Sequence, residues 1–158
     1  MTYTVFISHS TKDRGLVIAL ANLLTKFELN VFVAEWYLTP GEPIDQKIFA
    51  QINKADCVVV LLTEHGVRSP WVQQEVGYAL KTGKPVIPLV EKGTNPENLA
   101  ALQGREYIKY DPEQPQEALI KATSYVKSLQ LKKIEREKAL LIVGGILVLI
   151  LLLSGGEK

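Results

Sequence analysis

The 158-residue sequence has very few of the residues that build disulfides and metal sites. Cys57 is the only cysteine, and His9 and His65 are the only histidines. A single cysteine excludes an internal disulfide and fits a reducing compartment. These three side chains lack the clustered spacing of a zinc site, so we expect no metal. The formal net charge of +1 provides no basic footprint, and nucleic acid is therefore not an expected partner.

Two kinds of sequence signal are also missing. The opening stretch MTYTVFISHS has neither the basic nor the apolar region of a signal peptide, so we expect no export by the usual route. There is no Gly-x-Gly-x-x-Gly and no Walker lysine loop. A bound nucleotide would therefore not be held by a glycine-rich phosphate cradle. The length allows one domain with a proper core and a short appendage.

Short apolar runs alternate with helical patterns along the first 131 residues. This alternation predicts an α/β fold, a doubly wound five-stranded parallel sheet with helices on both faces. In such sheets, ligands gather beyond the carboxyl ends of the strands, which here are followed by residues 8–13, 35–43 and 63–70. Two prolines in the fourth run place it nearer the edge of the sheet. The expected strands are 4–8, 30–34, 56–63, 85–90 and 105–110, and the expected helices are 13–27, 44–55, 70–82 and 112–131.

The stretch SPWVQQEVGYAL, residues 69–80, predicts a helix with an unusual carboxylate. Ser69 suits the N-cap position and Pro70 the first helical position. At about 100° per residue, an apolar stripe runs along one face. Its members are Val72, Val76, Ala79 and Leu80. Trp71, Glu75 and Tyr78 form a second stripe on the flank, so Glu75 is expected at the edge of the core, too far along the helix to act in a capping box.

The tail contains an uninterrupted apolar segment. Residues 139–153 include no charged or polar side chain, and extending the helix to residue 156 gives a length of about 27 Å. A bilayer core of about 30 Å can be crossed with local thinning. We therefore expect a domain over 1–131, a charged linker over 132–138 and a transmembrane helix over 139–156. The alternative is a helix that drives assembly in solution.

The charges beside this segment predict its orientation. Four basic residues precede it, and only Glu157 and Lys158 follow it. Positively charged flanks remain cytoplasmic, so the expected location is a single-pass C-terminal membrane anchor with the domain in the cytoplasm. The basic residues are Lys132, Lys133, Arg136 and Lys138.

Four segments together resemble the Toll/interleukin-1 receptor (TIR) domain family of the bacterial and archaeal type. VFISHSTKD (5–13) resembles the family's first box, and VAEWYLTPGEPI (33–44) resembles the loop after its second strand. ADCVVVLLT (55–63) is similar to the central strand. SPWVQQEVGYAL is similar to the Ser-x-Trp…Glu helix. These segments occur in the family's order and spacing within residues 1–130.

The resemblance implies two alternative functions. Many family members are enzymes that cleave NAD+ between nicotinamide and ribose, by hydrolysis or by cyclisation of ADP-ribose, in cell defence or signalling. In those enzymes a glutamate on the third helix faces the ribose, and Glu75 is the matching residue. NAD+ would then be the substrate, and no cofactor is implied. Other members are non-catalytic adaptors that act by binding other TIR domains, and self-association is implied for both groups.

The first box offers further candidate residues. Neighbouring residues on a strand point to opposite faces, so Ser8 and His9 cannot form a nucleophile–base pair from one strand. With Ser10, they are placed to line the substrate cleft. Phe6 is expected in the core. Asp13 is expected to cap the first helix.

Three aromatic residues complete the predicted substrate site. Trp36 follows the second strand and would either stack on an aromatic ring of the ligand or close the core. Trp71 precedes Glu75 by four residues and shares its face, so it is expected to pack over the carboxylate. Tyr78 would exclude water from the other side. An ionised Glu75 is expected there, favoured by the nearby helix N-terminus.

Overall fold

The computed structural model describes residues 2–34, 41, 44–95, 102 and 104–155. It confirms the predicted five-stranded parallel sheet, with strand order β2-β1-β3-β4-β5. The two central strands are buried along almost their whole length, as their continuous apolar sequences require. The strands are β1 (Thr4–Ser8), β2 (Asn30–Val33), β3 (Cys57–Leu62), β4 (Val86–Glu91) and β5 (Ile108–Tyr110).

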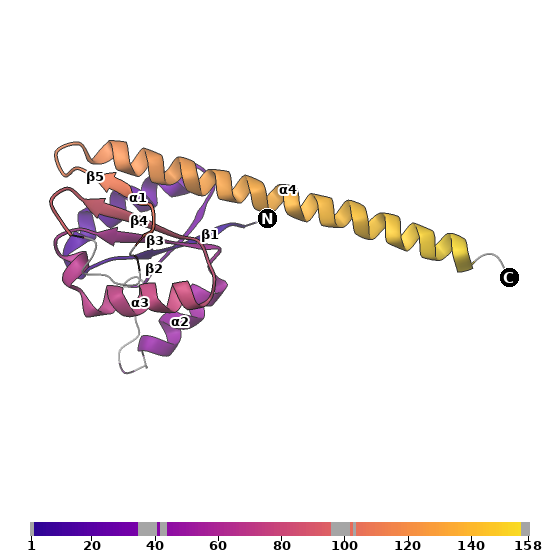
Figure 1. Ribbon diagram of the computed structural model, residues 1–158, viewed down its shortest axis with the longest axis horizontal. Helices are drawn as coiled ribbons and strands as arrows, with labels where there is room; N and C mark the ends of the chain where they lie inside the picture. Colours follow the sequence, from indigo (N-terminus) through magenta and orange to yellow (C-terminus); the bar gives the residue numbers. More distant parts are fainter. Residues whose placement is uncertain (1, 35–40, 42–43, 96–101, 103, 156–158) are drawn as a thin grey trace.

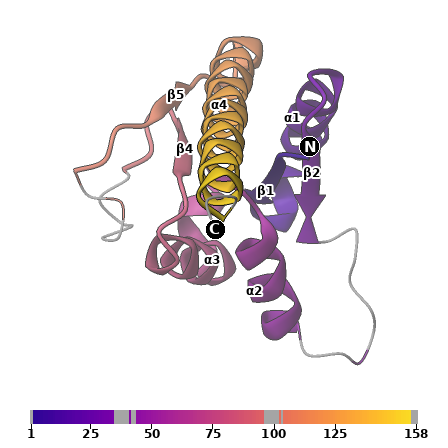
Figure 2. The ribbon, with the colours of Figure 1, turned by 90° about the vertical axis from the view of Figure 1, so that its right-hand side faces the viewer.

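Helices cover both faces of the sheet, as Figures 1 and 2 show. Helices α1 and α4 pack on one face, and α2 and α3 pack on the other. Alternate residues of β1 and β3 are divided between the two core clusters, because successive side chains on a strand point in opposite directions. The helices are α1 (Arg14–Lys26), α2 (Ile44–Lys54), α3 (Pro70–Lys81) and α4 (Pro115–Gly155), with short 3-10 helices η1 (Thr11–Asp13) and η3 (Gly66–Arg68).

Strand β4 accommodates Pro88 close to the edge of the sheet. The strand lies between β3 and β5, and Pro88 aligns with Val60 of β3. Strand β5 pairs with β4 only from Leu89 to Glu91. At Pro88, β4 therefore has a strand neighbour on one side only, which is the setting in which a proline is tolerated.

Helix α4 extends far beyond the sheet. It continues without a break through residues 132–138 and into the apolar segment. At about 1.5 Å per residue, its 41 residues span about 60 Å. Its most apolar 18-residue window has a mean hydropathy of 2.3 and is not buried within the molecule, so the helix could span a membrane. In Figure 1, the strands point away from the free end of α4.

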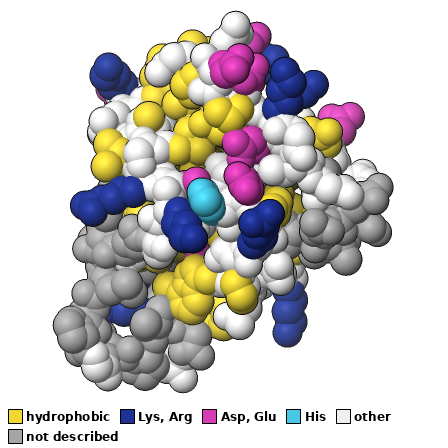
Figure 3. All heavy atoms as spheres, turned by 90° about the vertical axis from the view of Figure 1, so that its left-hand side faces the viewer, with side chains coloured by type: hydrophobic (Ala, Val, Ile, Leu, Met, Phe, Trp, Pro, Cys, Tyr) yellow, Lys and Arg dark blue, Asp and Glu magenta, His cyan; other side chains and the backbone are white. Residues whose placement is uncertain are grey.

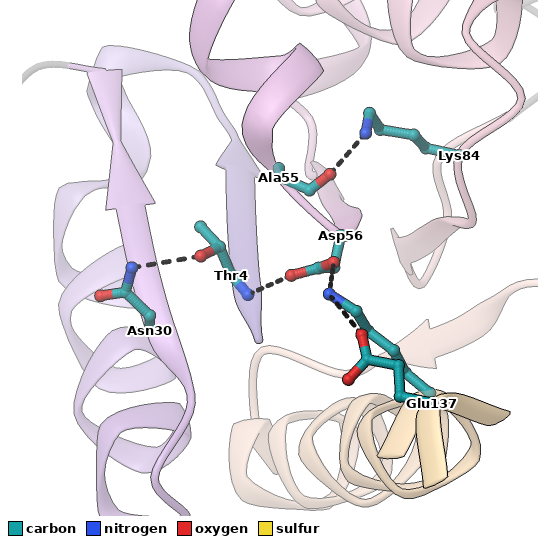
Figure 4. A network of polar contacts seen from close by, with 7 residues as sticks. Thr4, Asn30, Ala55, Asp56, Lys84 and Glu137 are labelled. Atoms are coloured by element: carbon teal, nitrogen blue, oxygen red, sulfur yellow. Dashed lines mark hydrogen bonds and ion pairs between the residues drawn. The ribbon is translucent and has the colours of Figure 1, made fainter. Parts of the chain in front are cut away.

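A network of polar contacts joins α4 to the amino ends of β1 and β3 (Figure 4). The Lys133 ammonium lies 2.6 Å from Asp56 Oδ1. The Thr4 backbone N–H donates to Asp56 Oδ2 at 2.8 Å. Glu137, one turn further along α4, lies 4.0 Å from the same ammonium. Asp56 therefore connects β1, β3 and α4, which fixes the rotation of α4 about its axis where the helix leaves the domain.

Candidate functional site

The carboxyl edge of the sheet brings together the sequence segments expected to bind a ligand. Ser8 ends β1, and His9 and Ser10 follow it directly. Helix α3 starts beyond the end of β3, on the other side of the same edge. Figure 3 shows this face of the molecule, where acidic and basic side chains and a histidine gather among apolar ones. The edge is therefore polar and partly charged, unlike the apolar free end of α4.

Local sequence fixes the position of Glu75 on α3. Ser69 is the N-cap, and its hydroxyl accepts from the Val72 N–H at 3.3 Å. Pro70 occupies the first turn, as predicted. Val72, Val76 and Ala79 are fully buried against the sheet. Glu75 is adjacent to this buried face of α3, and its side chain is only 2% exposed.

The Glu75 carboxyl and the Ser8 hydroxyl meet in the core between α3 and β1. Burial raises the pKa of Glu75 to about 8, and the Ser8 hydroxyl opposes that rise. The two groups are close enough to interact, but they do not form a well-aligned hydrogen bond. Ser8 Oγ and Glu75 Oε2 are both buried and have no hydrogen-bond partner among the described residues. Two such atoms together in a core are costly, and a catalytic role is one explanation for them.

The pKa of Glu75 differs from the expectation that the helix N-terminus would keep the carboxylate ionised. Glu75 is the sixth residue of α3, beyond the first turn in which the helix field is strong. Removal from water disfavours the charged form, and this effect is the larger one. At pH 7 the ligand-free protein therefore holds Glu75 mainly as the neutral acid.

His9 and Ser10 have defined partners at the exit of β1. His9 is 6% exposed, and its Nδ1 lies 2.8 Å from the Ser10 carbonyl oxygen. Because a carbonyl only accepts, Nδ1 donates the proton of this hydrogen bond. The Ser10 hydroxyl accepts from the Lys12 N–H at 3.3 Å and caps η1. Ser10 thus shapes the loop that positions His9.

The predicted aromatic residues have separate positions. Trp71 is half-buried and packs against the apolar cluster between the sheet, α2 and α3. Tyr78 stacks on Phe49 of α2, with ring centroids 4.2 Å apart. Both rings pack against the same apolar cluster as the buried face of α3, and their contact with a ligand at Glu75 stays a prediction. Trp36 lies outside the described residues, together with most of the loop over 35–43.

Asp13 does not cap a helix with its side chain, contrary to the prediction. It occupies the N-cap position of α1, but its carboxylate makes no capping bond. Instead it accepts a hydrogen bond from Thr63 Oγ1 at 2.5 Å. Thr63 Oγ1 in turn accepts from the Gly66 N–H at 3.0 Å. These bonds join the exits of β1 and β3, so Asp13 holds the two loops of the candidate site together.

Gly66 is required by this arrangement. A Cβ atom at this position would lie 2.1 Å from the carbonyl oxygen of Leu61, a backbone atom that cannot move aside easily. We therefore expect Gly66→Ala to destabilise the protein by at least about 3 kcal/mol, at the upper end for overpacked cores. Urea unfolding measures the effect. Gly77→Ala is the matched control, since its Cβ meets no atom within 4 Å and the change should stabilise α3 by about 0.5–1 kcal/mol. Equal unfolding midpoints for the two variants would contradict this prediction.

A hollow lies at the same edge, on the α1 side of the sheet. It has a volume of about 340 Å³, and its lining includes Asp13, Thr63 and Glu91. Glu75 is not part of it. Two of its carboxylates already have partners, since Asp13 accepts from Thr63 and Glu91 accepts from the Glu64 N–H at 2.6 Å. The unpaired groups at Ser8 and Glu75 make the α3 side the better candidate site.

Sequence reasoning missed the roles of Thr63 and Gly66. The sequence pattern places Thr63 only at the end of an expected strand, although β3 lies beside β1 in a sheet of this order and the two strands end at the same edge. A signal was therefore available for Thr63. The requirement for Gly66 depends on the approach of one backbone segment to another, which no local pattern reveals.

Comparisons with known proteins agree with this architecture. The sequence profile described as TIR domain matches residues 5–122. A comparison with curated sequences finds no significant match. Among solved structures, the TIR domain of the Toll-related receptor TRR-2 from Hydra magnipapillata superposes with a TM-score of 0.64 at 20% identity, covering 80% of this chain and 99% of that one.

Two further structures share the fold. A TIR-STING receptor from C. gigas, solved in complex with 2',3'-cGAMP, gives a TM-score of 0.60 at 16% identity, covering 73% of this chain and 38% of that one. The CMP N-glycosidase BcmB from Clostridium botulinum gives 0.51 at 20% identity, covering 81% and 98%. At these identities the likeness concerns the fold, while the profile match covers most of the sequence. The chain belongs to the TIR domain family.

Proposed function

We propose that the protein is a TIR-domain NAD+ nucleosidase that cleaves the bond between nicotinamide and ribose, with Glu75 as the catalytic residue. The observation that carries this proposal is the pair of buried, unpaired oxygens, Ser8 Oγ and Glu75 Oε2, at the carboxyl edge of the sheet. A protein that acts only through its outer surface has no use for a buried carboxyl with one oxygen unpaired. The fold is shared with a CMP N-glycosidase, which supports chemistry at an N-glycosidic bond on this scaffold.

The chemistry of this bond fits a buried carboxylate. Breaking the bond develops positive charge on the ribose, as in the oxocarbenium-like transition state of glycoside cleavage. Nicotinamide leaves as a neutral molecule, so no strong general acid is needed. A carboxylate in a site with little water stabilises the developing charge and accepts hydrogen bonds from ribose hydroxyls. Ser8 would orient the carboxylate or a ribose hydroxyl.

The raised pKa of Glu75 is compatible with this role because NAD+ carries a positive charge on its nicotinamide ring. A positive charge within a few ångströms favours the ionised carboxylate and lowers its pKa. Substrate binding would therefore release the proton that the free protein holds on Glu75 at pH 7. The neutral carboxylic acid avoids the cost of burying an unpaired charge in the free protein. The ionised form would be populated only when NAD+ is bound.

Product analysis tests the proposed function. The purified full-length protein, in detergent or in vesicles, is incubated with NAD+, and nicotinamide, ADP-ribose and cyclic ADP-ribose are quantified. Release of nicotinamide supports the nucleosidase, and the ratio of the two ribose products separates hydrolysis from cyclisation. If no nicotinamide is released from concentrated protein, the nucleosidase proposal fails and the adaptor alternative is favoured.

We further propose that α4 anchors the protein in a membrane with the TIR domain in the cytoplasm. Every apolar side chain from Leu140 to Leu153 is more than half exposed. A continuous apolar surface of this size is unfavourable in water and favours a membrane environment. The strands point away from the free end of α4, so the candidate site would open on the side opposite the bilayer (Figure 1).

Vesicle flotation tests the anchor. The full chain is expected to float with lipid vesicles after an alkaline wash, whereas a chain ending at Lys138 is expected to remain in the soluble fraction. This truncation keeps the polar network around Lys133, so the TIR domain retains its contacts with α4. The anchor proposal is wrong if the full chain and the truncated chain are equally soluble.

A further inference from the structure

Helices α1, α2 and α3 each end in a lysine at the amino edge of the sheet, where the strands begin. Because the five strands are parallel, the helices that connect them run in the opposite direction and end at this edge. Lys26, Lys54 and Lys81 are the last residues of the three helices, and each lies within five residues of the start of the next strand. All three residues are exposed. The amino edge therefore presents one cation from each of these helices.

Helix α4 leaves the domain through the same edge and adds further basic residues. Lys133 contacts Asp56, which directly precedes β3. Lys84 precedes β4, and its ammonium donates to the Ala55 carbonyl oxygen at 2.6 Å, so it lies beside the end of α2 (Figure 4). The exposed basic residues of α4 at this level are Lys132, Arg136 and Lys138.

Carboxylates at the amino edge are fewer and partly neutralised. Asp56 and Glu137 both contact the Lys133 ammonium, at 2.6 and 4.0 Å. The basic residues outnumber the exposed carboxylates that the structure describes there, which are Glu28, Glu106 and Glu135. The whole chain has a formal net charge of only +1, so the amino edge is basic relative to the rest of the molecule.

The amino edge also lies next to the start of the apolar segment. Leu140 follows Lys133 by seven residues, and α4 is continuous between them. At about 1.5 Å per residue, Leu140 is about 10 Å beyond Lys133. The continuous helix leaves no flexible connection that would let the domain move away from the bilayer (Figure 1). Head groups add several ångströms to each side of the bilayer core, so the amino edge of an anchored chain faces them directly.

We propose that the amino edge of the TIR domain binds the surface of an anionic bilayer, with Lys26, Lys54 and Lys81 in contact with acidic phospholipid head groups. A bilayer that contains such lipids has a negative surface potential. This potential strengthens association by about fivefold for each lysine or arginine near the surface. The basic edge and the bilayer are therefore complementary in charge, and α4 holds them together.

The fields of the helix C-termini do not explain this set of cations by themselves. A cation is favoured in the last turn of a helix, which applies to Lys26, Lys54 and Lys81. The basic residues of α4 lie many residues before the end of that helix, so its field does not favour them. A negatively charged surface explains both groups, because it extends along the whole amino edge. Binding would also hold the carboxyl edge, with Glu75, away from the bilayer.

Lysine acetylation in vesicles tests the proposed contact. The full-length protein is inserted into vesicles of phosphatidylcholine alone, or of phosphatidylcholine and phosphatidylserine in equal parts. A water-soluble reagent acetylates exposed lysines, and mass spectrometry gives the rate at each one. Lys26, Lys54 and Lys81 should react about fivefold more slowly on the anionic vesicles, because the bound ammonium groups are shielded. High salt should remove this difference.

Lys12 and Lys92 are the internal controls, because both are exposed and lie at the carboxyl edge of the sheet. They should react at the same rate on both kinds of vesicle. The double variant Lys54→Gln/Lys81→Gln should lose most of the protection of Lys26, whereas Lys12→Gln/Lys92→Gln should keep it. Equal acetylation of Lys26, Lys54 and Lys81 on the two kinds of vesicle would show that these lysines only offset the helix C-termini, and would overturn the proposal.

The inference rests on the proposed anchor, and flotation of the same samples separates the two. A chain that floats with both kinds of vesicle but shows equal acetylation on each retains the anchor and loses the bilayer contact. A chain that floats only with the anionic vesicles and is released by high salt loses the anchor and retains the contact. A chain that floats with neither contradicts both. None of these outcomes depends on chemistry at the candidate site, so Glu75→Gln should show the parent's acetylation pattern.

Discussion

Glu75→Gln is expected to reduce the rate of nicotinamide release by about 10²–10³-fold while leaving the fold intact. This range is typical for removal of one group that stabilises transition-state charge. In the ligand-free protein the carboxyl is mainly neutral at pH 7, since burial raises its pKa to about 8. Glutamine matches the size and polarity of that neutral acid. The variant therefore loses only the ability to ionise opposite a positively charged ribose.

The rate of nicotinamide release under saturating NAD+ measures this effect. Glu64→Gln is the control, because Glu64 lies at the same edge of the sheet but is exposed, with its carboxylate 3.9 Å from Arg68. It should keep the parent's rate. Circular dichroism establishes that both variants are folded. If folded Glu75→Gln releases nicotinamide as fast as the parent, Glu75 is not the catalytic residue.

Much of the fold was predictable because the sequence pattern is local. The apolar run over 56–63 is too continuous for a strand with one exposed face, and the structure places β3 at the centre of the sheet. The N-cap at Ser69 and Pro70 in the first turn were also confirmed. Each of these features depends on residues close together in the sequence. Strand pairing then follows from the small number of arrangements open to alternating strands and helices.

The candidate site was predictable only in part. Helical periodicity placed Glu75 at the edge of the core, but its nearly complete burial and the pKa that results depend on how α3 packs against β1. Asp13 accepts a hydrogen bond from Thr63, 50 positions away in the sequence. The local pattern predicts instead that Asp13 caps the first helix, and this prediction is wrong. For residues 132–138, the sequence predicted only a charged linker. Its helical continuity and the contact of Lys133 with Asp56 are tertiary features.

The free energy of unfolding should fall as the pH rises from about 5 to about 8, and Glu75 should be the cause. The folded protein holds a proton on Glu75 up to about pH 8, whereas the unfolded chain releases it near the ordinary value of 4.5. The folded state therefore binds more protons in this window. Its stability is fully present below about pH 4.5 and is lost as the pH rises through the folded pKa. The slope is about −1.4 kcal/mol per pH unit, and the total is on the order of 4 kcal/mol.

Urea unfolding of the chain ending at Lys138, measured at several pH values for the parent and for Glu75→Gln, tests this prediction. The variant has no titrating group at this position, so its advantage over the parent should grow steadily between pH 5 and pH 8. Burial also raises the pKa of Tyr3 and of the Cys57 thiol, but these groups ionise in the unfolded chain only near pH 9 and above, outside the window. Glu64→Gln should follow the parent at every pH. A constant difference between Glu75→Gln and the parent would show that Glu75 does not hold a proton in the folded protein, and the account of proton release on substrate binding would fail with it.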